Sequence, residues 1–222
     1  PKTVQEKINI LQNGNLLQAS QLSQLHNPDA RVSLDKFSDL HLLTKYSDAL
    51  NGMHGADSLR FRFNFWEITD FIIWDFFQCT NKKTENYGGK EYVFYWPDNG
   101  KIHRDNPKAY VKGESVWGKP GIVVSMMNEL PVTLYSGNKF DISCSPIVPK
   151  NMLHLIPIWC FCSSIEFNKE VRKIDQALKV TNATLVKIPF DLEHWTKVAQ
   201  EKYPNGLPKP YSNDPTQWIF HG

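Results

Sequence analysis

The 222-residue sequence lacks long apolar runs, because no window comes near the ~18 consecutive apolar residues that a membrane-spanning helix needs. It also lacks a signal-peptide pattern at its start. Neither sign of charge dominates, since the formal net charge is only +2. We therefore predict a cytoplasmic protein without a membrane partner. A nearly neutral chain neither requires nor excludes nucleic acid, because a basic face can be balanced by acidic residues elsewhere.

The motifs of common enzymes are absent as well. The sequence has no H-E-x-x-H zinc signature, no G-x-S-x-G elbow, no G-x-G-x-x-G turn and no Walker loop. Asp175 and Asp191 are candidate catalytic carboxylates, but we interpret Asp175 as part of a solvated helix face and Asp191 as a helix N-cap. We predict no catalytic, cofactor or metal site in this chain. An independent hydrolase, with a Cys–His or carboxylate pair, stays the weakest alternative.

Cysteine is scarce, with four residues in the chain. Cys160 and Cys162 form a C-x-C pair inside an apolar run, and no second metal-type pair lies nearby in the sequence. This pattern predicts reduced, buried cysteines and argues against a zinc site or disulfide bonds.

What the sequence does contain favours a folded, aromatic-rich domain. Hydrophobic residues make up 41% and charged residues 22%, which allows a packed core and argues against global disorder. Aromatic residues make up 13%, which favours a strand-rich or stacking-rich domain. Because the first residue is Pro and not Met, we expect the chain to be a piece of a longer protein.

Hydrophobic periodicity divides the chain into residues 1–58, read as a helical connector or an edge of a neighbouring domain, and a main domain at residues 59–222. In the connector we expect two short helices within residues 1–26, a turn at residues 27–29 and an amphipathic helix at residues 38–50. Helices are predicted to begin after residue 163 and at Asp191, and residues 203–222 are read as an extended tail. Residues 68–77 and 153–162 fit either a strand or a buried helix. Strands are predicted at residues 59–66, 92–96, 122–126, 130–135, 140–148 and 184–188.

Basic residues gather in the middle third of the chain, among glycines and aromatic residues. They include Lys82 and Lys83, the stretch from Lys101 to Lys112, and Lys119. Loops that a rigid sheet presents, with Lys and Arg for phosphates and Gly for close backbone approach, suit duplex DNA. The aromatic residues leave a carbohydrate- or protein-interaction module open as an alternative.

Several longer motifs resemble the C-terminal part of large bacterial adenine-N6 DNA methyltransferases of restriction-modification and phage-defence systems. The similarity spans most of the chain and is densest in its last half. The matching motifs are GKPGIVVSM at 118–126, LPVTLYSGNKFD at 130–141, FCSSIEFN at 161–168, VRKID at 171–175, VKIPFD at 186–191, YPNGLP at 203–208 and DPTQW at 214–218. Less distinctive matches are NPDAR at 27–31 and FWE at 65–67.

The resemblance implies an α+β target-recognition domain, a twisted and mainly antiparallel sheet with packed helices that presents loops to double-stranded DNA. Residues 181–191 are similar to the step in such specificity domains where an Asn- or Thr-bearing turn leads through a Pro into a helix. The family's Asn-Pro-Pro-aromatic motif, which holds the flipped adenine, is absent, and NPDA at 27–30 is only an echo of it. Catalysis and S-adenosylmethionine are therefore expected in an upstream domain of the same chain.

If the resemblance holds, phosphate contacts are expected from the basic loops and no residue can be assigned to a particular base. Trp117 either braces a loop, contacts DNA or packs in the core. The candidate DNA-binding residues are Lys101, Arg104, Lys108, Lys112, Lys119, Asn128 and Lys139.

Overall fold

A computed structural model describes residues 3–14, 18, 20–25, 30, 32 and 41–220, and the chain divides into two compact units, residues 1–40 and 41–222. The first unit contains helices α1 (Val4–Asn13) and α2 (Gln21–Gln24). Thr3 and Glu6 form a capping box that starts α1, each side chain accepting a hydrogen bond from the other's backbone N–H. The prediction of two short helices is confirmed. The predicted turn at 27–29 lies outside the described residues.

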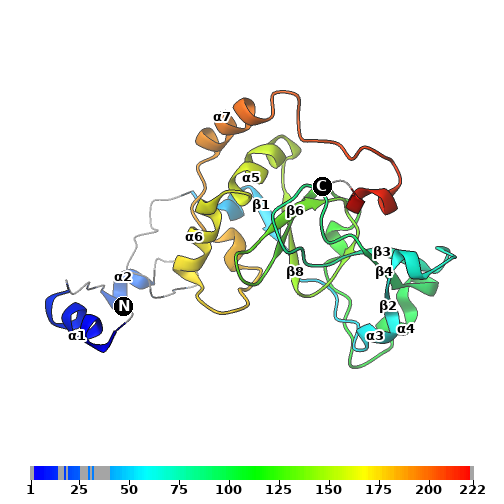
Figure 1. The fold of residues 1–222 in the computed structure, drawn as a ribbon, viewed down its shortest axis with the longest axis horizontal. Helices are drawn as coiled ribbons and strands as arrows, with labels where there is room; N and C mark the ends of the chain where they lie inside the picture. Colours follow the sequence, from blue (N-terminus) through cyan, green and yellow to red (C-terminus); the bar gives the residue numbers. More distant parts are fainter. Residues whose placement is uncertain are drawn as a thin grey trace. The chain divides into compact units, whose positions relative to one another are not determined.

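The second unit is built on a larger, fully antiparallel sheet in the order β1-β8-β5-β6 (Figure 1). Its central strands are apolar on both faces. Ile122 lies between Leu134 and Ile147 in the register, and all five residues of β5 are buried. The strands are β1 (Ser47–Ala49), β5 (Gly121–Ser125), β6 (Val132–Tyr135) and β8 (Cys144–Pro149).

Three helices form a layer on one face of this larger sheet: α5 (Leu155–Cys162), α6 (Ile165–Ile174) and α7 (Leu192–Lys202) (Figure 1). The nearly all-apolar α5 packs directly against the sheet. Phe161 is fully buried there, and its ring lies 5.6 Å from Phe167, 5.3 Å from Phe190 and 5.3 Å from Trp195. Burial of this aromatic cluster makes the layer the main hydrophobic core.

A smaller sheet, in the order β2-β4-β3-β7, is antiparallel except for the β3–β7 pair (Figure 1). Phe77, Phe94 and Trp96 pack in its own core, together with Met53 and Phe61. Its strands are β2 (Arg62–Asn64), β3 (Trp74–Gln78), β4 (Tyr92–Tyr95) and β7 (Lys139–Phe140), and the short helices α3 (Ser58–Phe61) and α4 (Lys101–Arg104) lie beside it. Short 3₁₀ helices occur at Leu43–Lys45, Phe65–Glu67, Pro97–Gly100, Glu114–Val116, Met152–His154, Thr184–Val186 and Pro215–Phe220.

The predicted α+β class with mainly antiparallel strands and packed helices is confirmed, although the strands form two sheets. Strands predicted at 92–96, 122–126 and 130–135 appear as β4, β5 and β6. The ambiguous segments 68–77 and 153–162 contain β3 and α5 respectively. Both helix starts are confirmed, because Ser164 accepts from Phe167 N–H and Asp191 accepts from His194 N–H. No helix in the described part of the chain is long and apolar enough to cross a membrane.

The helix predicted at 38–50 is wrong where the structure describes it, and residues 38–40 lie outside that part. Residues 43–45 form one 3₁₀ turn and residues 47–49 form β1, which pairs with β8 from Ser47↔Pro149 to Ala49↔Ile147. Tertiary pairing overrides the local helical pattern here. β1 belongs to the second compact unit, whereas the role of residues 1–58 as a connector stays a prediction.

Three strand predictions are wrong in extent or type. Residues 59–66 contain only three strand residues, because α3 precedes β2. Residues 140–148 divide into β7 and β8 at a turn in which Asp141 accepts from the Ser143 N–H. Residues 184–188 are no strand, because Thr184 donates its hydroxyl to buried Asp175 and begins a 3₁₀ turn instead.

Candidate nucleic-acid interface

Most of the predicted DNA-binding residues lie on residues 97–119, the connection from β4 of the smaller sheet to β5 of the larger sheet, which we call the lysine segment. The chain reverses after β4 at Asp98, Asn99 and Gly100, whose φ angles of 49°, 54° and 71° are all left-handed. His103 in α4 is buried, and its Nε2–H donates to the Tyr95 carbonyl over 2.7 Å. Burial lowers the pKa of His103, which favours the neutral ring. The segment is therefore fixed to the sheet at its start.

Arg104 and Lys139 are held by carboxylates of this same region. The Arg104 guanidinium makes a two-pronged ion pair with Glu114, with N–O distances of 3.0 and 2.8 Å, and it lowers the pKa of Glu114. The Lys139 ammonium lies 2.5 Å from the Asp75 carboxylate. These two cations are already paired with carboxylates of this chain at its surface and brace the lysine segment.

Aromatic rings complete this brace. The Arg104 guanidinium lies 5.6 Å from the Trp96 ring, and the Lys139 ammonium lies 4.8 Å from Trp96 and 4.6 Å from Trp117. The two indoles meet edge to face at 5.7 Å. Trp117 is half-buried and packs against the core of the smaller sheet, and its contact with DNA stays a prediction.

Lys108, Lys112 and Lys119 are exposed, and their ammonium groups make no ion pair within residues 41–220. Lys112 lies 4.8 Å from the ring of Tyr110, which stacks on His54 at 5.3 Å. Exposed ammonium groups without a carboxylate partner are groups that attract phosphates.

The other two candidates differ from these lysines. Lys101 is exposed, but it forms an ion pair with Asp105 one helical turn away. Asn128 lies in the turn between β5 and β6, at the opposite end of β5 from Lys119, and its carbonyl accepts from Arg172 over 2.7 Å. The structure thus groups the lysine segment and Lys139, and it places Asn128 elsewhere.

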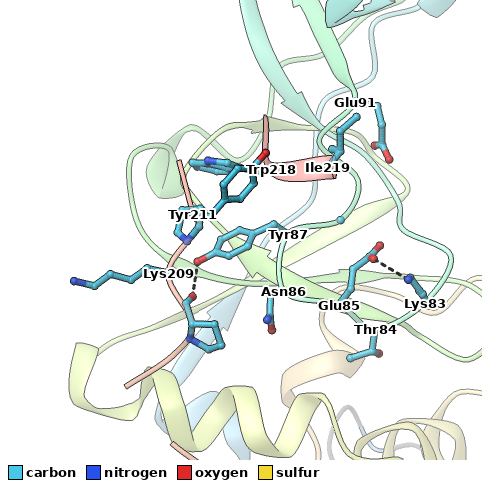
Figure 2. Close-up of a pocket in the computed structure, with 13 residues that line it drawn as sticks. Lys83, Thr84, Glu85, Asn86, Tyr87, Glu91, Lys209, Tyr211, Trp218 and Ile219 are labelled. Atoms are coloured by element: carbon cyan, nitrogen blue, oxygen red, sulfur yellow. Dashed lines mark hydrogen bonds and ion pairs between the residues drawn. The ribbon is translucent and has the colours of Figure 1, made fainter. Parts of the chain in front are cut away.

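A pocket of about 520 Å³, shown in Figure 2, lies between the loop of residues 83–91 and the tail of residues 208–219. The Tyr87 hydroxyl donates to the Pro208 carbonyl over 2.7 Å, and the Tyr87 and Trp218 rings lie 5.3 Å apart. Lys83 pairs with Glu85 at 3.5 Å along the loop, as Figure 2 shows. The sequence predicted a surface tail, but neither its anchor on this loop nor the pocket.

Lys90 is buried beneath this tail. Its ammonium donates to Gln78 over 3.0 Å and to Ser136 over 2.9 Å, and it lies 5.4 Å from the Trp218 ring. Removal from water disfavours the charged form, so burial lowers the pKa of Lys90 to about 7. Sequence reasoning missed this residue, because a lysine in a polar loop gives no sign of burial.

The structure gives no support to the hydrolase alternative. The four cysteines are free and buried, as predicted, and burial raises the pKa of the Cys79 and Cys162 thiols. Asp175 is buried and not on a solvated helix face as expected, since it accepts hydrogen bonds from the backbone N–H groups of Ala177 and Thr181. No group of three His, Cys, Asp or Glu within the described residues could hold a metal ion.

Comparisons with known proteins bear on the fold. The chain matches no protein-family model and no curated protein. The Type IIL restriction-modification enzyme MmeI, solved in complex with DNA, matches with a TM-score of 0.51 and 12% identity over 83% of this chain and 32% of that chain. An HsdS subunit from Thermoanaerobacter tengcongensis matches with a TM-score of 0.42 and 11% identity over 89% of this chain and 46% of that chain.

The chain therefore spans about a third of the length of MmeI. At 12% identity the likeness concerns the fold alone, so this chain shares the fold of one part of a restriction-modification enzyme.

Proposed function

We propose that this chain is the DNA sequence recognition region of a bacterial adenine-N6 DNA methyltransferase. The observation that carries the proposal is the fold shared with MmeI, a restriction-modification enzyme whose structure was solved with DNA. The three exposed, unpaired lysines of the lysine segment support it, because ammonium groups without carboxylate partners bind duplex phosphates. The motifs that resemble adenine-N6 methyltransferases supply the reaction class.

In this proposal Lys108, Lys112 and Lys119 contact phosphates, and Lys101 joins them when DNA competes with Asp105. Arg104 and Lys139 keep the lysine segment in place on the smaller sheet. An upstream domain of the same polypeptide binds S-adenosylmethionine, extrudes the adenine and transfers the methyl group to its exocyclic amine. The protein works in the cytoplasm, where the DNA lies.

The test uses the full-length polypeptide with radiolabelled S-adenosylmethionine and a mixture of random-sequence duplexes. The expected product is N6-methyladenine within one short sequence, and triple replacement of Lys108, Lys112 and Lys119 by Ala lowers methylation at limiting DNA by tenfold or more. Methylation of cytosine, or N6-methylation that ignores sequence, would contradict the proposal. An upstream sequence without an Asn-Pro-Pro-aromatic motif would contradict it as well.

A further inference from the structure

One face of the smaller sheet is aromatic and only partly covered. The pairings Phe63↔Val93↔Phe76 and Trp74↔Tyr95 place these five side chains on the face opposite Phe77 and Phe94, and Tyr95 at its edge also stacks on the core residue Phe61 at 6.2 Å. Phe63 is 36% exposed, and Trp74, Phe76 and Tyr95 are half-buried. Their rings contact one another, with Phe63 and Trp74 5.4 Å apart and Trp74 and Tyr95 5.2 Å apart. We call these residues the aromatic face.

The loop of residues 66–73 extends this face into solvent. Trp66 is 57% exposed and Ile72 is 88% exposed, while Phe71 stacks on Phe76 at 5.7 Å. The loop has a defined shape, because Asp70 accepts a hydrogen bond from the Ile72 N–H over 2.8 Å. Exposed apolar side chains beside a partly covered aromatic face mark an interaction surface on a folded protein.

The rim of the aromatic face is acidic. Glu67 and Asp70 lie on the loop, and Asp57 and Asp98 line a shallow hollow of about 680 Å³ beside Tyr95. None of the four carboxylates makes an ion pair within residues 41–220. Arg60 and Lys101 are the cations that line this hollow, and Lys101 is paired with a further carboxylate there, Asp105, and also interacts with Asp98.

The acidic rim distinguishes between three kinds of binding partner for the aromatic face: a nucleic acid, a second copy of this chain and a basic protein surface. Phosphates are repelled by unpaired carboxylates, and proteins that stack single-stranded bases surround their aromatic residues with cations. A second copy docked through the same face would bring two acidic rims together, which disfavours association. A protein surface with an apolar centre and a rim of Lys and Arg complements both the shape and the charge.

We propose that the aromatic face and the 66–73 loop dock a protein partner whose surface has an apolar centre and a Lys- and Arg-rich rim. Exposed Trp and Phe side chains are the residue types that anchor protein interfaces. The proposal does not depend on DNA recognition, because its apolar centre and the 66–73 loop lie outside the lysine segment, and of the four rim carboxylates only Asp98 belongs to that segment.

The test measures binding of two dye-labelled amphipathic helical peptides to the full chain by fluorescence anisotropy. Both peptides carry leucines at the same positions, but one has lysines on its polar face and the other has glutamates. The lysine peptide is expected to bind about tenfold more tightly than the glutamate peptide. Since the chain has a net charge of only +2, a local surface and not the whole molecule must create this preference.

Variants locate the binding surface. Phe71→Ser with Ile72→Ser is expected to weaken binding of the lysine peptide about tenfold. The matched control is Leu153→Ser, because Leu153 is 82% exposed in the other half of the same unit. Glu67→Gln with Asp70→Asn keeps both hydrogen-bond acceptors, removes two charges, and is expected to weaken binding about threefold while reducing its salt dependence.

Equal affinity for the two peptides, no binding of the lysine peptide, or insensitivity to the Phe71 and Ile72 changes would overturn the proposal. Binding of labelled single-stranded DNA that weakens in the Phe71→Ser, Ile72→Ser variant would also overturn it. A homodimer of the chain that dissociates in this variant would overturn it as well. Failure of DNA binding at the lysine segment would leave the peptide results unchanged, so that the two proposals fail separately.

Discussion

The two sheets of the second unit differ in what they bury. The larger sheet is aliphatic at its centre, with Ile122, Val124 and Ile147 fully buried, and three helices cover one of its faces. The smaller sheet is aromatic and leaves one face half open. It also carries the lysine segment and the acidic 66–73 loop. From this difference we infer that the larger sheet and its helices contribute most of the folding free energy. The smaller sheet presents charged and aromatic surfaces.

The largest loss of stability is expected from a mutation in the helical layer of the larger sheet. Phe161→Ala removes a fully buried ring and is expected to lower the free energy of unfolding by about 3–5 kcal/mol. Urea denaturation followed by circular dichroism measures this loss. The control Leu153→Ala changes an 82% exposed side chain and is expected to cost less than about 0.5 kcal/mol. A loss of similar size in both variants would contradict the assignment of the core.

A second, smaller effect concerns Lys90, which joins β3 to the chain after β6 through Gln78 and Ser136. Its pKa in the folded state is about 7, below the usual lysine value, so above pH 7 the unfolded state binds more protons than the folded state. Stability contributed by this residue therefore rises with pH from 7 upward, by roughly 1–2 kcal/mol up to pH 8.5.

Comparing the wild type with Lys90→Met isolates this contribution. Subtraction cancels the titration of other groups, and the difference in unfolding free energy is expected to change with pH only above 7. Thermal melts at pH 6, 7, 7.75 and 8.5 measure it. A difference that stays constant over this range would show that Lys90 keeps an ordinary pKa.

Arg104→Ala tests whether Arg104 stabilises the lysine segment through Glu114 or binds DNA itself. Loss of the partly exposed pair with Glu114 is expected to lower the unfolding free energy by about 0.5–1 kcal/mol. DNA affinity should fall less than in a variant of Lys108, whose ammonium is unpaired. If Arg104→Ala weakens DNA binding more than Lys108→Ala does, then Arg104 leaves Glu114 to bind phosphate.

Local patterns were sufficient for the central strands and for the helix caps. β4 and β5 are continuous apolar runs ended by turn residues, Asp191 caps its helix as expected, and the helix predicted after residue 163 is capped by Ser164. β1 could not be predicted, since its partner β8 lies about a hundred residues later. The same holds for residues 184–188, where a hydrogen bond to Asp175 decides the conformation.

The candidate site shows the same limit. The sequence located the basic loops, but it could not show which cations are already neutralised. Lys139 finds Asp75 across 64 residues, and only the folded sheet brings them together through the β3–β7 pair. The acidic rim of the aromatic face was equally hidden, because its carboxylates come from three separate loops.

DNA recognition through the lysine segment is tested by the salt dependence of duplex DNA binding in two charge-matched triple variants. One replaces Lys108, Lys112 and Lys119 by Ala. The other replaces Lys169, Lys197 and Lys202 by Ala, which removes the same formal charge from α6 and α7 in the helical layer of the larger sheet.

The first variant is expected to bind duplex DNA at least about tenfold more weakly than the wild type, with a log–log salt slope smaller by about 2–3. The second variant is expected to keep the slope of the wild type within about 1. Equal losses in the two variants, or a duplex affinity that salt does not change, would contradict DNA recognition through the lysine segment.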